Sequence, residues 1–464
     1  MANAHKLTYT PYNGGSDLFL TQEGNYGLKS EILKLLEECS DVIKICSFII
    51  TDDDIYNVLL DKAKKSKTAI FILTQLDESK LQNSSGDMEY LTEEELQDNS
   101  KQKHFSHIQK LYENGAHVRT SDSAHAKFII ADRKIGIITS ANLTTPSLSE
   151  NTESGFHLAD EDVMVLDHLF DSIFLKGTNF NKFLVANSEK TMAVQSKLTI
   201  KLKDLPDINN SNLRYTYEKL TTNLYQELVG IITAADKFLF ISTYSIVGLH
   251  LLPEFTSAIE RANQRGVEIK IFCRGMNYRT DHLLGSTILK ELGCELYADY
   301  LNHSKGIISE KSAMIFTANI DGNHGLKNGF EVGYILSEQQ RLEFLNFHKY
   351  LISISDYIFD AKPLRNEFFK TYKNYEKSKN IKGPDFPENI IVNLKKGQHF
   401  EEKGLSTLPI FYAKSDNDKF LACGNILIRC NYSDGIFDVI ESCRPRFDLQ
   451  KFILNYKTLK ITNH

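Results

Sequence analysis

The sequence has 464 residues, of which 42% are hydrophobic and 25% are charged. These fractions are typical of globular proteins and argue against a disordered or fibrous chain. The length exceeds what one hydrophobic core usually fills and predicts two or three domains. The net charge of −6 is unevenly spread: residues 361–464 carry 18 basic against 12 acidic side chains, and residues 1–360 carry 36 against 48. A polyanionic substrate would therefore have to be attracted by local clusters of basic side chains, because the net charge of the protein is negative.

The N-terminal segment MANAHKLTYTPYNGG has neither the charged start nor the apolar run of a secretory signal, and no stretch is long enough to cross a bilayer. We therefore expect a cytoplasmic protein. The seven cysteines are scattered without a CxxC pair, which favours reduced thiols over disulfides. Cys423, Cys430 and Cys443 are the best metal candidates, but strand-like apolar runs surround the first two. We expect neither a structural zinc nor a cofactor.

In chain order, the first predicted unit is a strand in residues 42–50, a helix in IYNVLLDKAKK and a strand in TAIFILT. The same succession returns in residues 237–275 as KFLFISTYSI, FTSAIERANQRG and VEIKIFCRG. Strands with near-continuous apolar runs, alternating with helices, indicate an α/β sheet buried on both faces. The chain therefore contains an internal repeat.

Residues 76–100 have no counterpart in the second copy. Ile45 and His125 are 80 positions apart, whereas Ile241 and His303 are 62 apart, so the first copy is longer by 18 residues. The extra segment is polar and acidic and contains Gly86 and paired serines. It is typical of a solvated surface loop, and a lid over the site is the other interpretation.

The repeat continues, because residues 108–143 resemble residues 288–320. Each segment predicts a helix, a short strand and then a strand pair around a His-x-Lys triplet. After about residue 364 the repeat gives way to a Lys-rich passage and short apolar runs, which indicate a small, mainly β appendage. The predicted organisation is a first half in residues 1–183, a linker in 184–212, a second half in 213–363 and a C-terminal appendage in 364–464.

Both copies carry the same kinds of polar residue in the same order. The first has His125, Lys127, Asp132, Ser140 and Asn142, and the second has His303, Lys305, Glu310, Thr317 and Asn319. Because side chains alternate along a strand, the His and Lys of each triplet face the same way. The spacing therefore presents an imidazole and an ammonium group to one pocket.

A glutamate completes each set. Glu153 and Glu331 each lie 28 residues after the histidine of their copy, and each has a glycine two residues on. A carboxylate held against one imidazole nitrogen would fix the tautomer and stabilise the imidazolium when it forms. The matched spacing predicts such a carboxylate for each of the two imidazoles.

This set of residues suits phosphodiester chemistry. Two lysines and two asparagines can surround the anionic oxygens while a neutral imidazole attacks phosphorus. One histidine would become phosphorylated, and the other would protonate the leaving oxygen and later activate the water or alcohol that releases the product. Such a mechanism requires no metal.

These motifs resemble the His-Lys-Asp signature of the phospholipase D superfamily, and the likeness covers about residues 30–360. The first copy, HAKFIIADRKIGIITSANL, follows the pattern nearly throughout, with Thr139 where glycine is usual. In the second copy Glu310, or Ser309 if a gap falls later, stands at the acidic position, and Thr317 replaces the usual serine. The resemblance implies a duplicated α/β sandwich that forms one bilobal catalytic unit.

The resemblance also implies roles for the polar residues. His125 would be the nucleophile and His303 the general acid, with Lys127, Asn142, Lys305 and Asn319 around the phosphate. Asp132, Ser140, Glu310 and Thr317 would support them. Both motifs lie in one chain, so a monomer can hold a complete site, and a dimer remains open.

The sequence leaves three functions open. The first is a metal-independent nuclease for DNA or RNA, such as a defence or restriction effector, favoured by the lack of membrane segments and by the basic appendage. The second is a phospholipid hydrolase or transphosphatidylase, although tryptophan, which favours membrane interfaces, is absent. The third is a non-catalytic phosphate-binding module. The substrate is expected to be nucleic acid rather than phospholipid, without integral membrane association.

Two further histidines, His104 and His107, lie at helical i, i+3 spacing and could form a ligand pair. The acidic insertion nearby favours a solvated helix face for both. They are therefore not expected to take part in the site.

Overall fold

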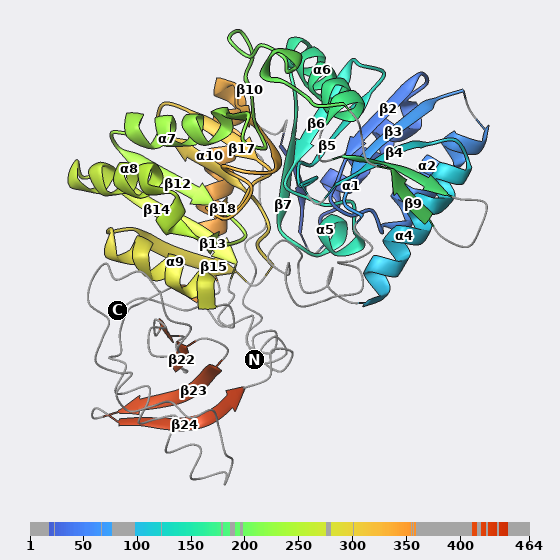
Figure 1. The fold of residues 1–464 in the computed structure, drawn as a ribbon. Helices are drawn as coiled ribbons and strands as arrows, with labels where there is room; N and C mark the ends of the chain where they lie inside the picture. The colour runs from blue at the N-terminus through green and yellow to red at the C-terminus, as the bar shows by residue number, and fades with distance from the viewer. Residues whose placement is uncertain are drawn as a thin grey trace.

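The computed structural model describes residues 18–358, apart from 23, 66, 77–97, 122, 178–179, 186–190, 195–197, 275–279, 300, 354 and 356, and the strands within residues 411–443. Two nine-stranded sheets stand side by side, each with helices packed against it (Figure 1). The fold is mixed α/β, as the sequence predicts.

The first sheet has the strand order β1-β7-β6-β5-β2-β3-β4-β8-β9. Its strands are β1 (Leu18–Thr21), β2 (Val42–Cys46), β3 (Ala69–Thr74), β4 (His117–Thr120), β5 (Phe128–Ala131), β6 (Ile135–Thr139), β7 (Glu153–His157), β8 (Asn181–Val185) and β9 (Thr191–Val194). Neighbours β2, β3 and β4 are parallel, and β5, β6 and β7 continue the sheet in antiparallel pairs.

The second sheet has the order β11-β10-β19-β17-β16-β12-β14-β15-β20. Its strands are β10 (Leu213–Tyr217), β11 (Thr221–Thr222), β12 (Phe238–Ser242), β14 (Glu268–Arg274), β15 (Glu295–Asp299), β16 (Gly306–Ser309), β17 (Ala313–Phe316), β19 (Phe330–Ile335) and β20 (Tyr357–Ile358). From β10 to β20, the order and pairing directions repeat those from β1 to β8. The internal repeat of the sequence is thus a repeat of sheet topology.

Helices separate the strands in chain order. The helices of the described residues are α1 (Gly27–Glu38), α2 (Asp53–Lys65), α4 (Asp98–Glu113), α5 (Thr145–Ser149), α6 (Asp160–Lys176), α7 (Asn223–Ala234), α8 (Pro253–Gln264), α9 (Thr280–Glu291) and α10 (Glu338–Ser353), with short 3-10 turns at Leu202–Asp204 and Leu249–Leu251. Helix α2 shows why such segments are helical. Its apolar residues Ile55, Tyr56 and Leu59 share one buried face, and acidic residues at its start and lysines at its end match the helix dipole.

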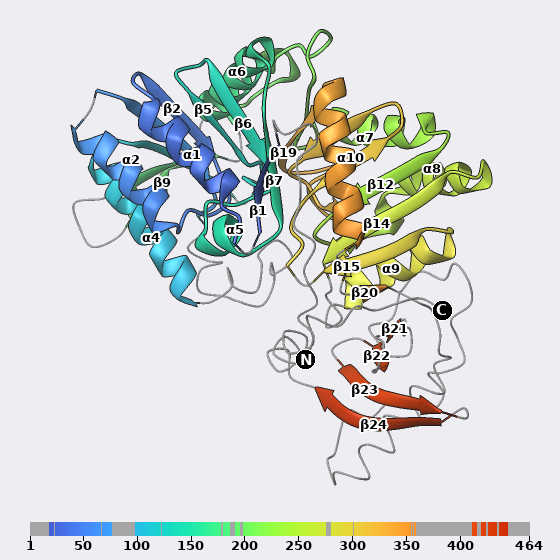
Figure 2. The same ribbon diagram turned by 180° about the vertical axis from the view of Figure 1, so that it is seen from behind.

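Three hydrophobic clusters hold these layers together. One joins α1, α2 and α4 to the first sheet, and another joins α7, α8 and α9 to the second. The third lies between the two halves and contains Phe170 of α6, Phe347 of α10, and strand residues of both sheets such as Phe128 and Ile315. Figure 2, seen from behind, shows α10 beside the junction of the halves. Because this central cluster takes residues from both copies, the two halves pack as one unit.

Smaller sheets complete the fold. Strands β13 (Ile246–Val247) and β18 (Ile320–Asp321) form a parallel pair. A four-stranded antiparallel sheet contains β21 (Phe411–Lys414), β22 (Lys419–Cys423), β23 (Ile426–Ser433) and β24 (Ile436–Cys443). The predicted domain boundaries stay predictions. In the described parts of the chain, no helix combines the length and the apolar character that crossing a bilayer requires.

Candidate active site

Both His-x-Lys triplets lie just before a strand that pairs with the end of a parallel strand. Phe128, which follows Lys127, pairs with Cys46, the last residue of β2. Gly306, which follows Lys305, pairs with Ser242, the last residue of β12. The triplets therefore extend past the carboxyl ends of the parallel strands, where α/β sheets usually bind ligands.

Backbone contacts bring the two triplets together. The Thr152 N–H of the first half donates to the Leu301 carbonyl at 2.9 Å, and the His303 N–H donates back to the Thr152 carbonyl at 2.9 Å. Near the first triplet, the Phe330 N–H of the second half donates to the Ser123 carbonyl at 3.0 Å. His125, Lys127, His303 and Lys305 are all buried at this junction.

Each imidazole is paired with a carboxylate from the opposite half. The Nδ1 atom of His125 lies 2.5 Å from Oε1 of Glu331, and Nδ1 of His303 lies 2.6 Å from Oε1 of Glu153. Both carboxylates are fully buried. The site is therefore shared between the copies, because each His–Glu pair takes its histidine from one half and its glutamate from the other.

A hydroxyl group holds the second oxygen of each glutamate. The Ser140 hydroxyl donates to Glu153 at 2.6 Å, and the Thr317 hydroxyl donates to Glu331 at 2.5 Å. Threonine in the second copy therefore makes the same contact as serine in the first. Each pair becomes a chain of hydroxyl, carboxylate and imidazole.

The two lysines fold back on their own triplets. The Lys127 Nζ donates to the His125 carbonyl at 2.6 Å, and the Lys305 Nζ donates to the His303 carbonyl at 2.8 Å. The Lys305 Nζ also lies 3.4 Å from Nε2 of His303. The Lys305 ammonium group therefore lies beside the His303 imidazole, and the charge of Lys127 acts to lower the pKa of His125.

Burial and charge act differently on the two His–Glu pairs. Burial lowers the pKa of His125, although the Glu331 carboxylate opposes it. Burial works to raise the pKa of Glu331, but the charge and hydrogen bond of His125 outweigh it and the pKa is lowered. Burial raises the pKa of Glu153 to about 7, against the opposing charge of Lys305 and the hydroxyl of Ser140. Burial thus favours a proton on the Glu153 carboxyl near neutral pH, whereas Glu331 is ionised beside a neutral His125.

Residues 32–174 match the family model described as cardiolipin synthase, PLD-like domain, where PLD denotes phospholipase D. These residues of the first half are therefore similar to a phospholipase D-like domain. Phosphatidylserine synthase from Haemophilus influenzae Rd KW20 has a TM-score of 0.55 and 10% identity, over 78% of this chain and 94% of that chain. This similarity shows the fold alone, which in this chain is mixed α/β with two large sheets.

Two other solved structures are similar at lower scores. Polyphosphate kinase from Porphyromonas gingivalis has a TM-score of 0.45 and 13% identity, over 72% of this chain and 49% of that chain. The phospholipase D family member Nuc from Salmonella typhimurium has a TM-score of 0.25 and 17% identity, over 30% of this chain and 90% of that chain. A search of curated proteins finds no match.

The acidic residues of the two motifs contact backbone groups at the starts of β2 and β12 rather than the imidazoles. Asp132 follows β5, and its carboxylate accepts hydrogen bonds from the backbone N–H groups of Ser40, Asp41 and Val42 and from the Cys39 thiol. The Glu310 carboxylate accepts hydrogen bonds from the backbone N–H groups of Asp236, Lys237 and Phe238, at the start of β12. Glu310, rather than Ser309, is thus the counterpart of Asp132, and both tie a motif hairpin to the start of a central strand.

Removal of the Asp132 carboxylate should destabilise the protein. Partial burial works to raise the pKa of Asp132, but the Cys39 thiol and backbone N–H donors outweigh it and hold the pKa well below its usual range. A lowered folded-state pKa contributes stability above pH 4 or so, which is lost as pH falls further. We expect Asp132→Ala to lower the free energy of unfolding by about 1.5–3 kcal/mol at pH 7, measured by urea denaturation, and by less at pH 3.

The matched control for that measurement is Asp61→Ala. Asp61 makes an exposed i, i+4 ion pair with Lys65 on α2, which contributes about 0.3–0.5 kcal/mol. If Asp132→Ala cost no more than Asp61→Ala, the hydrogen bonds of Asp132 would not stabilise the hairpin.

The asparagines that follow these hairpins are also buried. Asn142 comes two residues after Ser140, and Asn319 two residues after Thr317, in the loops beyond β6 and β17. Each asparagine thus lies two residues beyond the hydroxyl that binds a buried glutamate. Contact between these amides and a substrate stays a prediction.

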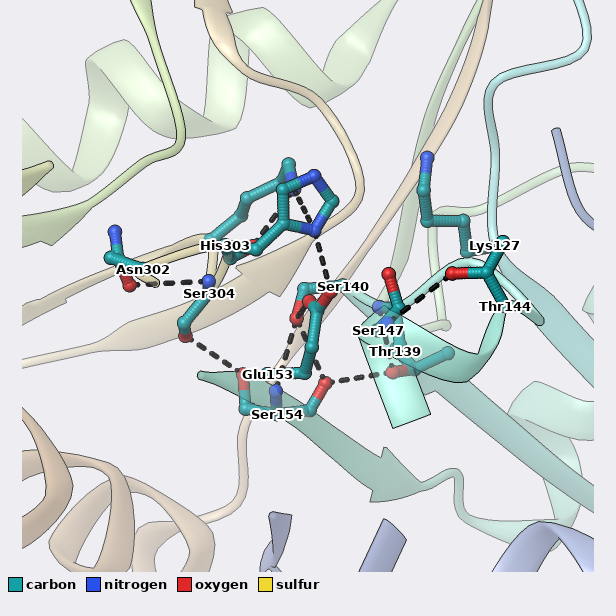
Figure 3. Close-up of polar contacts among 12 residues, drawn as sticks. Lys127, Thr139, Ser140, Thr144, Ser147, Glu153, Ser154, Asn302, His303 and Ser304 are labelled. Atoms are coloured by element: carbon teal, nitrogen blue, oxygen red, sulfur yellow. Dashed lines mark hydrogen bonds and ion pairs between the residues drawn. The ribbon is translucent and has the colours of Figure 1, made fainter. Parts of the chain in front are cut away.

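Several polar residues at the junction escaped sequence analysis. The Ser304 hydroxyl lies 3.0 Å from that of Ser154, and Asn302 accepts from the Ser304 N–H and donates to the Thr243 carbonyl. Figure 3 shows His303 and Ser304 facing Glu153 and Ser154, with dashed contacts crossing between the halves, and Asn302 in contact with Ser304. Ser304 is the middle residue of its triplet, where the first triplet has Ala126. The sequence therefore gives no sign of its role, which is visible only in its contact with Ser154 of the other half.

The prediction for His104 and His107 was wrong. Both are buried on α4 rather than solvated: His104 hydrogen-bonds the backbone, and His107 stacks on Tyr56 with ring centroids 3.8 Å apart. Within the described residues, no group of three or more His, Cys, Asp or Glu side chains is placed to hold a metal. The side chains of Cys423, Cys430 and Cys443 and most of the 76–100 insertion lie outside the described residues.

Proposed function

We propose that this protein is a phosphodiesterase that acts through a phosphohistidine intermediate and requires no metal. The observation that carries the proposal is the pair of buried imidazoles, each held at Nδ1 by a carboxylate from the opposite half and each flanked by a lysine. The two sets are complete in both copies, which favours catalysis over a non-catalytic phosphate-binding module.

In the first step, Nε2 of His125 attacks phosphorus and the new N–P bond replaces the P–O bond to the leaving group. The leaving oxygen takes a proton from Nε2 of the His303 imidazolium. In the second step, His303 removes a proton from water, the water oxygen attacks phosphorus, and the N–P bond breaks. Lys127 and Lys305 stabilise negative charge on the phosphoryl oxygens throughout.

The different pKa shifts support this division of labour. A nucleophile must be neutral, and burial lowers the pKa of His125. A general acid must have a proton to donate, and burial raises the pKa of Glu153 to about 7, which supports a proton at the carboxyl that contacts Nδ1 of His303. We therefore propose His125 as nucleophile and His303 as general acid and base.

The same shifts predict a bell-shaped pH profile of kcat/KM. Activity should rise with pH as His125 loses its proton, at a pKa below the usual imidazole value, and should fall as pH rises through about 7 and the Glu153–His303 pair loses its proton. Glu153→Gln should shift the fall to lower pH, because an amide cannot stabilise the His303 imidazolium. An unchanged alkaline side in this variant would contradict the assignment.

The substrate that we propose is DNA or RNA. The lack of membrane-spanning helices in the described residues and the basic balance of residues 361–464 support a polyanionic substrate in aqueous solution. A phospholipid substrate is the second candidate, because the matched family model is described as cardiolipin synthase and a phosphatidylserine synthase shares the fold. The two classes share a phosphodiester and the same site chemistry.

A substrate panel separates these candidates. Wild-type protein would be incubated in EDTA at low salt with single- and double-stranded DNA, RNA and mixed phospholipid vesicles, with a bis-aryl phosphodiester as a generic substrate. We expect cleavage of the aryl diester and of nucleic acid. Cleavage of lipid alone would replace the nuclease proposal with the second candidate, and cleavage of nothing would overturn the phosphodiesterase proposal.

A further inference from the structure

Two buried histidines outside the motifs make matching contacts in the two halves. His104 on α4 and His282 on α9 are 2% and 0% exposed. Both lie behind the loops that leave the central strands β2 and β12. Neither is part of the His–Glu pairs described above.

His104 bridges two segments of the first half. Its Nδ1 accepts a hydrogen bond from the Ile50 N–H at 3.1 Å, and its Nε2 lies 3.0 Å from the Gln75 carbonyl, to which it donates. Burial lowers the pKa of His104 to about 4, so the ring is neutral at pH 7, with one donor and one acceptor nitrogen. The imidazole therefore connects the loop after β2 to the residue that follows β3.

His282 makes the same connections in the second half. Its Nδ1 accepts from the Ile246 N–H at 3.0 Å, and its Nε2 lies 3.1 Å from the carbonyl of Arg274, the last residue of β14. In both halves the same strand-end residue also donates its N–H to the loop: Gln75 to Phe48 at 3.2 Å and Arg274 to Tyr244 at 3.3 Å. The arrangement is thus a duplicated structural device.

Each anchored loop places an aromatic ring against a site imidazole. The ring of Phe48 meets that of His125 edge-on, with centroids 5.6 Å apart and planes 69° apart. The ring of Tyr244 meets that of His303 in the same way, at 4.9 Å and 71°. Edge-to-face contacts restrict the orientation of both rings. With Nδ1 held by a glutamate, the aromatic contact supplies a second restraint on each imidazole plane.

We propose that His104 and His282 are positioning residues for His125 and His303, acting through the loops that carry Phe48 and Tyr244. This inference rests on the proposed function, because it assigns each buried histidine to one catalytic role. Loss of the anchor lets the loop and its ring move, so the imidazole no longer directs Nε2 at its target. His104 therefore affects nucleophilic attack, whereas His282 affects proton transfer.

The test compares His104→Leu and His282→Leu on two aryl phosphodiesters. Bis(4-nitrophenyl) phosphate has a good leaving group that needs little protonation, whereas a diphenyl diester needs a general acid. The readout is kcat/KM, which reports the steps through release of the first phenol. We expect His104→Leu to lower it roughly tenfold to a hundredfold for both substrates, and His282→Leu to lower it by that factor for the phenyl diester but much less for the nitrophenyl diester.

Three controls separate positioning from loss of folded protein. His104→Asn and His282→Asn retain an acceptor near Nδ1 for the loop N–H and should recover most of the activity. Urea denaturation should show that the leucine variants are fully folded under the assay conditions. Asp162→Asn removes a buried carboxylate that binds Ser211 and Asn212 away from these loops, and should lower stability without changing the ratio between the substrates.

Hydrogen exchange at the amides of Ile50 and Ile246 measures the anchors directly. Exchange should accelerate at Ile50 in His104→Leu and at Ile246 in His282→Leu. Unchanged exchange, or an equal loss on both substrates in His282→Leu, would overturn the proposal. Wild-type protein that cleaves no phosphodiester would overturn the proposed function instead, and the exchange rates alone would then decide whether the two histidines anchor the loops.

Discussion

Replacement of His125 with alanine should lower kcat/KM for phosphodiester cleavage by about 10⁴-fold or more, the range found when an enzyme loses its nucleophile. Nε2 of His125 forms the bond to phosphorus, and alanine offers no atom in its place. Water could then attack only directly, without the covalent intermediate. The variant should therefore lack both turnover and a nitrophenol burst.

The matched control is His157→Ala, because His157 is partly exposed at the end of β7 and contacts Glu31 rather than the site. This variant should keep full activity. Residual turnover in His125→Ala above about 1% of wild type would contradict the assignment of His125 as nucleophile. Activity at that level is what remains when an enzyme loses a general acid or base rather than its nucleophile.

Replacement of His303 with alanine should lower kcat/KM by about 10²–10⁴-fold on substrates with poor leaving groups, which is the usual contribution of a general acid or base. With bis(4-nitrophenyl) phosphate the loss should be smaller, because nitrophenolate leaves without a proton. Hydrolysis of the intermediate still needs His303 as a base. The variant should therefore release one nitrophenol quickly and then stall with its covalent intermediate intact.

Rapid-mixing measurements would compare the burst of nitrophenol release in His303→Ala with that in His125→Ala. A burst in His303→Ala and none in His125→Ala would establish the order of the two roles. The reverse pattern would exchange the nucleophile and the acid while retaining the paired-histidine mechanism.

The repeat and the polar residues of the motifs could be predicted from sequence because each depends on local pattern. Strand alternation predicts that His125 and Lys127 lie on one side, and equal spacing identifies Glu153 and Glu331 as a related pair. Which imidazole each carboxylate would bind is a different question. The exchange of glutamates between halves depends on how the two sheets meet, and spacing along the chain carries no such information.

The loops behind the imidazoles show a second limit of sequence. Residues 42–50 and 237–246 are mostly apolar and predict continuous strands, but β2 ends at Cys46 and β12 at Ser242. The residues that follow leave the sheet because the buried Thr74 and Thr243 hydroxyls and His104 and His282 bind their backbone. The acidic insertion suggested a solvated face for His104, whereas its hydrogen bonds to the backbone make burial favourable.

The most direct test of the paired-histidine mechanism is identification of the covalent intermediate. His303→Ala would be mixed with bis(4-nitrophenyl) phosphate in EDTA, quenched at alkaline pH and digested for mass spectrometry. We predict one phosphoryl group, with its remaining nitrophenyl ester, on the peptide that contains His125, and none in His125→Ala. An unmodified His125 after a full nitrophenol burst, or the same adduct on another residue, would contradict the mechanism.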